Sequence, residues 1–119
     1  PAKLDILGFD ACLQASFGVI ATVAEFAHYI VASEDLAPGH GWDYRGLKPE
    51  NAGAEEFGKA LIDQFMAFRT QDWETGEMVH QNPKTQVLVK TEVWQNEFMP
   101  KVNKLFAKLS KGLQARMNY

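Results

Sequence analysis

The chain has 119 residues, 46% of them hydrophobic and 23% charged, with a formal net charge of −3 at pH 7. That is enough for one small globular domain or for a piece of a larger one. The negative charge argues against nucleic acid as a partner, because a polyanion binds to a basic surface. No apolar run is long enough for a transmembrane helix and no signal peptide is visible, so we expect no membrane partner.

The first residues, Pro1-Ala2-Lys3, contain no initiator Met and lead directly into an apolar run. Either proteolytic processing or a truncation boundary is expected to have set this end. Cys12 is the only cysteine, which excludes an internal disulfide and zinc sites built on cysteine pairs.

The first half of the chain alternates strand and helix signals. Residues 4–9 form a short apolar run ended by Asp10, which predicts a buried strand. Ser16 is the expected N-cap of a helix over residues 17–28, where small and aliphatic side chains share one face. Residues 29–32 are β-branched or aromatic at most positions and predict a second strand.

The second half begins with a loop over residues 33–51, which is rich in glycine and proline. Residues 54–69 have the periodicity of an amphipathic helix, and a polar loop through Asn82-Pro83 leads to a third strand over residues 85–90. Pro100 suits the first turn of a final helix. The apolar face predicted for that helix consists of Val102, Leu105, Phe106, Leu109 and Leu113.

This order of elements predicts an α/β fold with a parallel sheet covered by helices. Three strands make a thin sheet, so the chain is expected to be about half of an α/β domain.

Asp10 and Cys12 follow the first strand, at the edge of the sheet where open α/β folds bind ligands. They are two residues apart, so in extended backbone both project to the same side. A thiol there can act as a nucleophile when a histidine activates it. On position alone, a small buried hydrophobe is the favoured reading of Cys12, and a turn-forming or capping carboxylate is an alternative reading of Asp10.

Three segments together resemble the clostripain family of cysteine peptidases, which belongs to the caspase-like clan. They are DILGFDACL at residues 5–13, VASED at residues 31–35 and PGHGWDY at residues 38–44. The similarity is specific over residues 5–44 and looser as far as residue 113. It implies that residues 1–119 are the C-terminal part of a caspase-like domain, with a mostly parallel sheet completed by a missing upstream segment.

The resemblance also implies roles for individual residues. Cys12 matches the catalytic nucleophile, and Asp10 matches an acidic residue of the pocket that accepts Arg or Lys before the scissile bond. A carboxylate at a pocket base pairs well with either cation. Ser33, Glu34 and Asp35 match the segment that lines the same pocket, with Asp35 the better acidic candidate. Trp42, beside a glycine, either shapes the pocket wall or anchors the core.

The family's general base is a histidine of a His-Gly pair that precedes the cysteine. No histidine precedes Cys12 in this sequence. The resemblance therefore implies that the base lies on an upstream segment or on a companion chain cut from the same precursor by self-cleavage. His40 lies in the loop after the second strand but matches no family position. His28 is expected near a helix end, and His80 in a solvated loop.

The chemistry needs no cofactor, although the family's frequent calcium dependence makes calcium possible. Glu34, Asp35 and Asp43 could supply oxygen ligands, but no spacing resembles an EF-hand loop, so no ligands are assigned. The predicted function is an endopeptidase that cleaves peptide or protein substrates after Arg or Lys. The alternatives are a non-catalytic homologue that acts as a binding or regulatory module, and a different α/β hydrolase that uses cysteine. The resemblance further implies a bacterial protein and favours a secreted or cell-envelope location.

Overall fold

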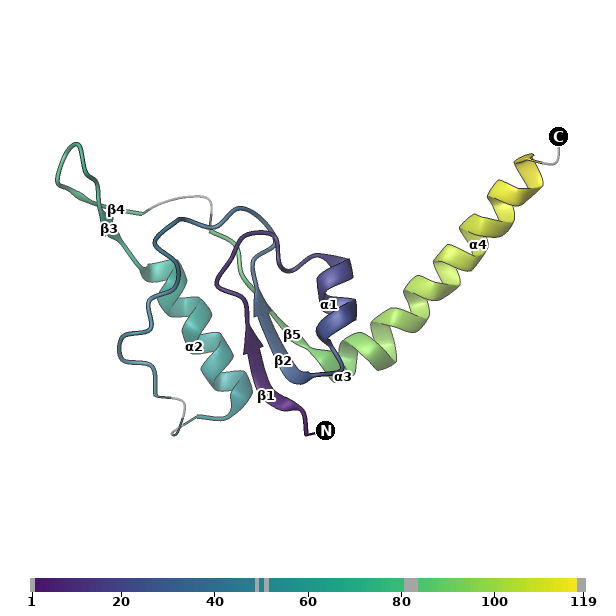
Figure 1. The fold of residues 1–119 in the computed structure, drawn as a ribbon, viewed down its shortest axis with the longest axis horizontal. Helices are drawn as coiled ribbons and strands as arrows, with labels where there is room; N and C mark the ends of the chain where they lie inside the picture. Colours follow the sequence, from purple (N-terminus) through teal and green to yellow (C-terminus); the bar gives the residue numbers. More distant parts are fainter. Residues whose placement is uncertain (1, 49, 51, 81–83, 118–119) are drawn as a thin grey trace.

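The computed structural model of the chain describes residues 2–48, 50, 52–80 and 84–117. Pro1, Pro49 and the predicted Asn82-Pro83 loop lie outside the described residues. The molecule is elongated, with extents of 64 × 39 × 18 Å. A three-stranded sheet between two helices forms its body, and a hairpin and a long helix project from opposite ends of that body (Figure 1).

The sheet contains β1 (Leu4–Gly8), β2 (Ala27–Ala32) and β5 (Val87–Lys90), in the order β1-β2-β5. β1 and β2 are parallel, but β5 is antiparallel to β2. The predicted α/β class is confirmed, whereas the prediction of a parallel third strand is wrong. The reason lies in the connection: the long loop after β2 returns the chain to the start of the sheet, and α2 (Ala54–Ala67) then carries it back (Figure 1). β5 therefore enters where β2 ends.

β1 lies at the edge of this sheet rather than inside it. Leu4 is 53% exposed, Asp5 is exposed, and Ile6 and Leu7 are half-buried. The prediction of a buried first strand is therefore wrong for the described part of the chain. An apolar run does not distinguish a central strand from an edge strand.

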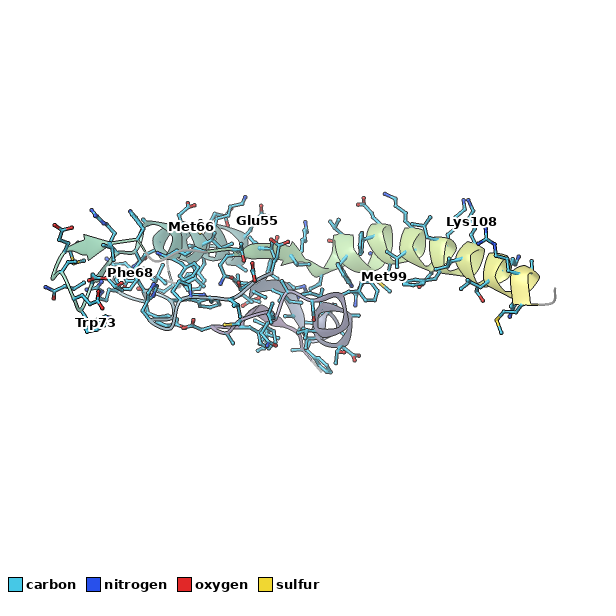
Figure 2. The ribbon with its side chains drawn as sticks, turned by 90° about the horizontal axis from the view of Figure 1, so that it is seen from above. Glu55, Met66, Phe68, Trp73, Met99 and Lys108 are labelled. Carbon is cyan, nitrogen blue, oxygen red and sulfur yellow. The ribbon has the colours of Figure 1, made fainter. Side chains whose placement is uncertain are left out.

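The two faces of the sheet pack against different helices. Ile30 of β2 packs against Ile20 on α1 (Phe17–Val23), while the next residue, Val31, packs against Leu61 and Phe65 on α2. Successive side chains of a strand point to opposite faces, so this central strand is buried on both sides. Figure 2 shows the two helices on opposite sides of the sheet.

Both predicted helices of the body end earlier than expected. Ser16 caps α1 as predicted, since its Oγ accepts a hydrogen bond from the amide of Val19 at 3.4 Å. The helix stops at Val23, and His28 belongs to β2, because pairing with β1 begins at Ala27. α2 ends at Ala67, where the buried Lys84 donates hydrogen bonds to the carbonyls of Phe65 and Phe68. Burial lowers the pKa of this lysine, although a cation is favourable at a helix C-terminus.

The segment predicted as a polar loop contains a small hairpin of β3 (Thr70–Gln71) and β4 (Met78–Val79). Asp72 forms its turn, because Oδ1 accepts hydrogen bonds from the amides of Glu74 and Thr75 at 3.0 and 2.8 Å. Local side-chain hydrogen bonds of this kind stabilise turns. Strands this short carry too little hydrophobic alternation to be recognised in the sequence.

The final helical region begins before the predicted Pro100. It consists of α3 (Thr91–Val93), the π-helical segment η2 (Trp94–Phe98) and α4 (Met99–Met117). Proline cannot donate to a helical hydrogen bond, and its ring collides with the carbonyl four residues earlier. The wider turn of η2 lies immediately before Pro100, and helices commonly depart from regular α geometry at a proline.

α4 stands clear of the body (Figures 1 and 2). Leu105, Phe106, Leu109 and Leu113 of its predicted apolar face are 52–65% exposed, and only Val102 is half-buried. The amphipathic pattern was recognised correctly, but the described chain offers this face no surface to pack against. Within the described ranges, no helix combines the length and apolarity needed to cross a membrane.

Candidate active site

The chain leaves β1 in a tight turn that places Asp10 and Cys12 beside the glycine-rich loop. The amide of Phe9 donates to the carbonyl of Val31 at 2.9 Å, which holds the end of β1 against β2. Beyond it a cavity of about 400 Å³ opens between the turn and the loop. Its lining residues are Asp10, Ala11, Cys12, Ala37, Pro38, Gly39, His40 and Gly41. The structure thus brings the predicted nucleophile and the predicted pocket acid to one cavity.

The thiol of Cys12 is half-buried against the backbone of Ala37. Its Sγ accepts a hydrogen bond from the Ala37 amide at 3.2 Å. The thiol also donates to the Ala37 carbonyl, with Sγ 3.7 Å from the oxygen. The carbonyl of Cys12 accepts a hydrogen bond from Nε2 of Gln14 at 3.0 Å. These contacts fix the thiol in position at the cavity wall.

Leu13, the residue after the cysteine, has a φ of 60°. This left-handed conformation is easily adopted by glycine but is unfavourable for a residue with a bulky side chain such as leucine. It is held by the surroundings: the amide of Leu13 donates to the carbonyl of Asp35 at 3.1 Å, and the amide of Ala15 donates to the carbonyl of Ser33 at 2.8 Å. Strained residues held by their surroundings occur preferentially at functional sites.

Ser33 and Thr85 support the segment to which the cysteine turn is bonded. The Ser33 hydroxyl is fully buried, donates to the carbonyl of Asp35 at 2.8 Å, and lies 3.1 Å from the Thr85 hydroxyl. The Thr85 hydroxyl also accepts the Asp35 amide at 3.1 Å. The Asp35 carboxylate accepts the amide of Leu36 at 2.7 Å. Asp35 and Glu34 are exposed and do not line the cavity of Cys12.

Asp10 is held by the loop that follows. Both carboxylate oxygens accept the amide of Trp42, at 3.1 Å for Oδ1 and 3.0 Å for Oδ2. The hydroxyl of Tyr44 donates to Oδ2 at 2.9 Å. Burial and the adjacent Asp10 carboxylate raise the pKa of Tyr44 to about 12.

The side chain of Trp42 belongs to the core rather than to the lining of this cavity. It is 8% exposed, and a Cβ built on Gly8 would lie 2.8 Å from its ring. The side-chain amide of Gln86 links Trp42 to the sheet when its oxygen and nitrogen are placed to suit their neighbours. The oxygen then accepts from Nε1 of Trp42 and the nitrogen donates to the carbonyl of Ala32, each at 2.9 Å. Trp42 therefore anchors the loop to the sheet, and its neighbour Gly41 lines the cavity.

The three histidines occupy different environments. His28 is exposed on β2 and His80 is exposed after β4. His40 lines the Cys12 cavity, but its ring packs against Phe65 and Phe68, with centroids 6.0 and 4.9 Å apart. Its Nδ1 lies 2.6 Å from the carbonyl of Gly41. In the described part of the chain, the hydrogen-bonding contacts of the thiol are to Ala37 and not to a histidine.

The acids considered for calcium do not converge. Asp43 pairs with Arg45, whose Nε and Nη2 lie 2.8 and 3.0 Å from its two oxygens. The Asp35 carboxylate is directed at the amide of Leu36. Over the residues that the structure describes, no three His, Cys, Asp or Glu side chains are grouped so that they could hold a metal ion. These residues do not fit a calcium site, and calcium dependence stays a prediction.

Three contributors were not recognised in the sequence. Ala37 acts through its backbone, so its residue type gives no signal. Thr85 supports Ser33 from 52 residues further along the chain, which no local pattern reveals. Tyr44 is part of the GWDY motif, but only the structure shows its hydroxyl on Asp10.

Comparison with known proteins places this geometry in context. A search of solved structures finds a cysteine protease of B. fragilis, with 26% identity and a TM-score of 0.47. The match covers 55% of this chain and 26% of that one, so the matched region is about a quarter of the neighbour's length. No curated protein matches. The family model described as the clostripain family matches residues 1–118. This chain therefore belongs to the clostripain family.

Proposed function

We propose that this chain supplies the nucleophile and the basic-residue pocket of a cysteine endopeptidase that cleaves after Arg or Lys. The observation that carries the proposal is the shared cavity, in which the only thiol of the chain and the carboxylate of Asp10 line one space of about 400 Å³. Membership of the clostripain family supports the same assignment.

The reaction begins with attack of the Cys12 thiolate on the carbonyl carbon of the scissile bond. The C–N bond breaks, the amine leaves with a proton from a histidine, and the acyl group remains on sulfur as a thioester. Water then hydrolyses the thioester and restores the thiol. The amide of Cys12 is the proposed oxyanion donor, and the turn at Leu13 orients this backbone.

We assign the histidine to a segment outside this chain. Support comes from the positions of His28 and His80 on other surfaces, and from the packing of His40 against two phenylalanines. The open side of β1 gives further support, because β1 pairs within the described ranges only with β2. An edge strand readily accepts another strand, and an upstream strand added there would lie beside Cys12.

Substrate recognition is assigned to Asp10, which is exposed at the same cavity as the thiol. A guanidinium or ammonium group gains charge-assisted hydrogen bonds from a carboxylate in such a position. Ser33 and Asp35 are assigned a supporting role, since their carbonyls accept the amides of Ala15 and Leu13 in the cysteine turn. Glu34 is exposed beside them and does not line the cavity.

The test uses the complete protein, including the segment with the proposed histidine. Hydrolysis of a peptide with a single Arg is compared with that of a peptide carrying norleucine at the same place. Cys12→Ala should reduce turnover to background, while the exposed Thr22→Ala on α1 should leave it unchanged. Full turnover in the Cys12 variant overturns the assignment. Equal cleavage of the two peptides overturns the basic specificity.

The same protein also distinguishes the non-catalytic alternative. An Arg-containing chloromethyl ketone should alkylate Cys12 of the complete protein, and mass spectrometry would locate the adduct. Absence of both labelling and turnover in correctly folded protein would favour a binding or regulatory module.

A further inference from the structure

The two oxygens of the Asp10 carboxylate are not equivalent. Oδ2 accepts both the Tyr44 hydroxyl at 2.9 Å and the Trp42 amide at 3.0 Å. Oδ1 accepts only the shared Trp42 amide, at 3.1 Å, within the described structure. A carboxylate offers about two acceptor positions on each oxygen. Tyr44 therefore fills Oδ2 and leaves a free position on Oδ1.

Gly41 adds to this asymmetry from the cavity side. A Cβ built on Gly41 would lie 2.8 Å from Oδ2 and 3.2 Å from Oδ1, so the side of Gly41 that faces the carboxylate is nearer to Oδ2. Both the hydrogen bonds and the packing thus leave Oδ1 as the more available oxygen.

The asymmetry affects the two basic side chains differently. A guanidinium binds a carboxylate best through two parallel hydrogen bonds, one to each oxygen. An ammonium is a compact donor that needs only one oxygen. A carboxylate with one available oxygen therefore removes much of the advantage that Arg has over Lys.

We propose that Tyr44 is a specificity-determining residue, whose hydroxyl occupies Oδ2 of Asp10 and thereby limits the preference of the pocket for Arg over Lys. This inference rests on the proposed function. The ring of Tyr44 lies beside that of Trp42, with centroids 6.1 Å apart and planes tilted by 51°, so a phenylalanine can keep the same contact and lose only the hydroxyl.

The test is Tyr44→Phe in the complete protein, with Tyr29→Phe as the matched control. Tyr29 also donates its hydroxyl to a carboxylate, that of Glu55 at 3.0 Å, and it does not line the Cys12 cavity. The ratio of kcat/KM for two peptides that differ only in Arg or Lys should rise about fivefold or more in Tyr44→Phe, because one strong hydrogen bond becomes available to the guanidinium. The ratio should not change in Tyr29→Phe.

A ratio that stays within twofold of the wild type, or that falls, overturns the proposal. Tyr44→Met, which also lacks the hydroxyl, checks that the shift does not depend on the ring. Calorimetric binding of agmatine and cadaverine provides a measurement without turnover, and agmatine should gain affinity over cadaverine in Tyr44→Phe. If the wild-type protein cleaves neither peptide, the proposed function is refuted. If the affinity of agmatine relative to cadaverine is the same in Tyr44→Phe as in the wild type, the role of Tyr44 is refuted.

Discussion

Gly41 and Asp10 are packed so closely that a Cβ on Gly41 would lie 2.8 Å from the Asp10 carboxylate. Gly41 also has a φ of +67°, which L-residues with side chains rarely adopt. These two constraints act at the wall of the Cys12 cavity, so a substitution there changes the geometry of the site directly.

Gly41→Ala is therefore expected to lower kcat/KM for a basic peptide by about tenfold or more. The reason is the ~1–3 kcal/mol of local strain that a side chain introduces at such a position. Gly18→Ala on α1 is the control, because a Cβ there meets nothing within 4 Å and Gly18 does not line the Cys12 cavity. Steady-state kinetics on the complete protein makes the comparison. Equal activity of the two variants would contradict the close packing of Gly41 on Asp10.

Tyr44 should titrate unusually late. Its pKa is raised to about 12 by burial and by the Asp10 carboxylate, against 10.0 for an ordinary tyrosine. The folded pKa is the higher one, so the contribution of this contact to stability is fully present below pH 10 and is lost as the pH rises through about 12. Absorbance near 295 nm, measured in the wild type and in Tyr44→Phe, should show that the variant lacks one late-titrating tyrosine.

Asp43 is expected to titrate at the opposite extreme. Hydrogen bonds from Arg45 lower its pKa from 3.8 to about 2. The folded pKa is depressed, so the stabilising contribution is present above pH 3.8 and is lost as the pH falls through about 2. Arg45→Gln should raise the pKa of the carboxyl toward its ordinary value, as followed by NMR of side-chain carboxyl carbons, while the Arg45 amide still donates to Oδ1. An unchanged titration would show that the pair does not persist in solution.

Phe65 should matter far more for folding than a phenylalanine on α4. Phe65 is fully buried in the cluster with Trp42 and Val31, whereas Phe106 is 59% exposed. Phe65→Ala should lower the free energy of unfolding of the complete protein by ~3–5 kcal/mol, because it leaves a cavity in the core. Phe106→Ala should change it by less than about 1 kcal/mol. Urea denaturation measures both, and a reversed order would show that α4 is packed in the complete protein.

Much of the fold could be predicted from local patterns. The parallel pairing of β1 with β2, the N-cap at Ser16 and the amphipathic α2 each depend on residues close together in the sequence. The direction of β5 could not be predicted in this way, since it depends on where a long irregular loop delivers the chain. The exposure of β1 also lay beyond the sequence, because burial depends on neighbours that an apolar run does not identify.

The candidate site was likewise predicted only in part from the sequence. The motifs around Asp10 and Cys12 predicted that these two residues lie together, and the structure shows them at one cavity. The contacts that position them come from backbone groups and from distant residues, such as the Ala37 amide and the Tyr44 hydroxyl. Such contacts are set by tertiary geometry, which residue identity alone does not encode.

The reversed direction of β5 separates the two ends of the segment that contains it. Thr85 and Gln86, just before the strand, brace the loops around the cysteine, whereas the exit of β5 leads through α3 to α4 at the far edge of the sheet (Figure 1). A fluorophore or affinity handle attached near Met117 would therefore report on the molecule without obstructing the Cys12 cavity.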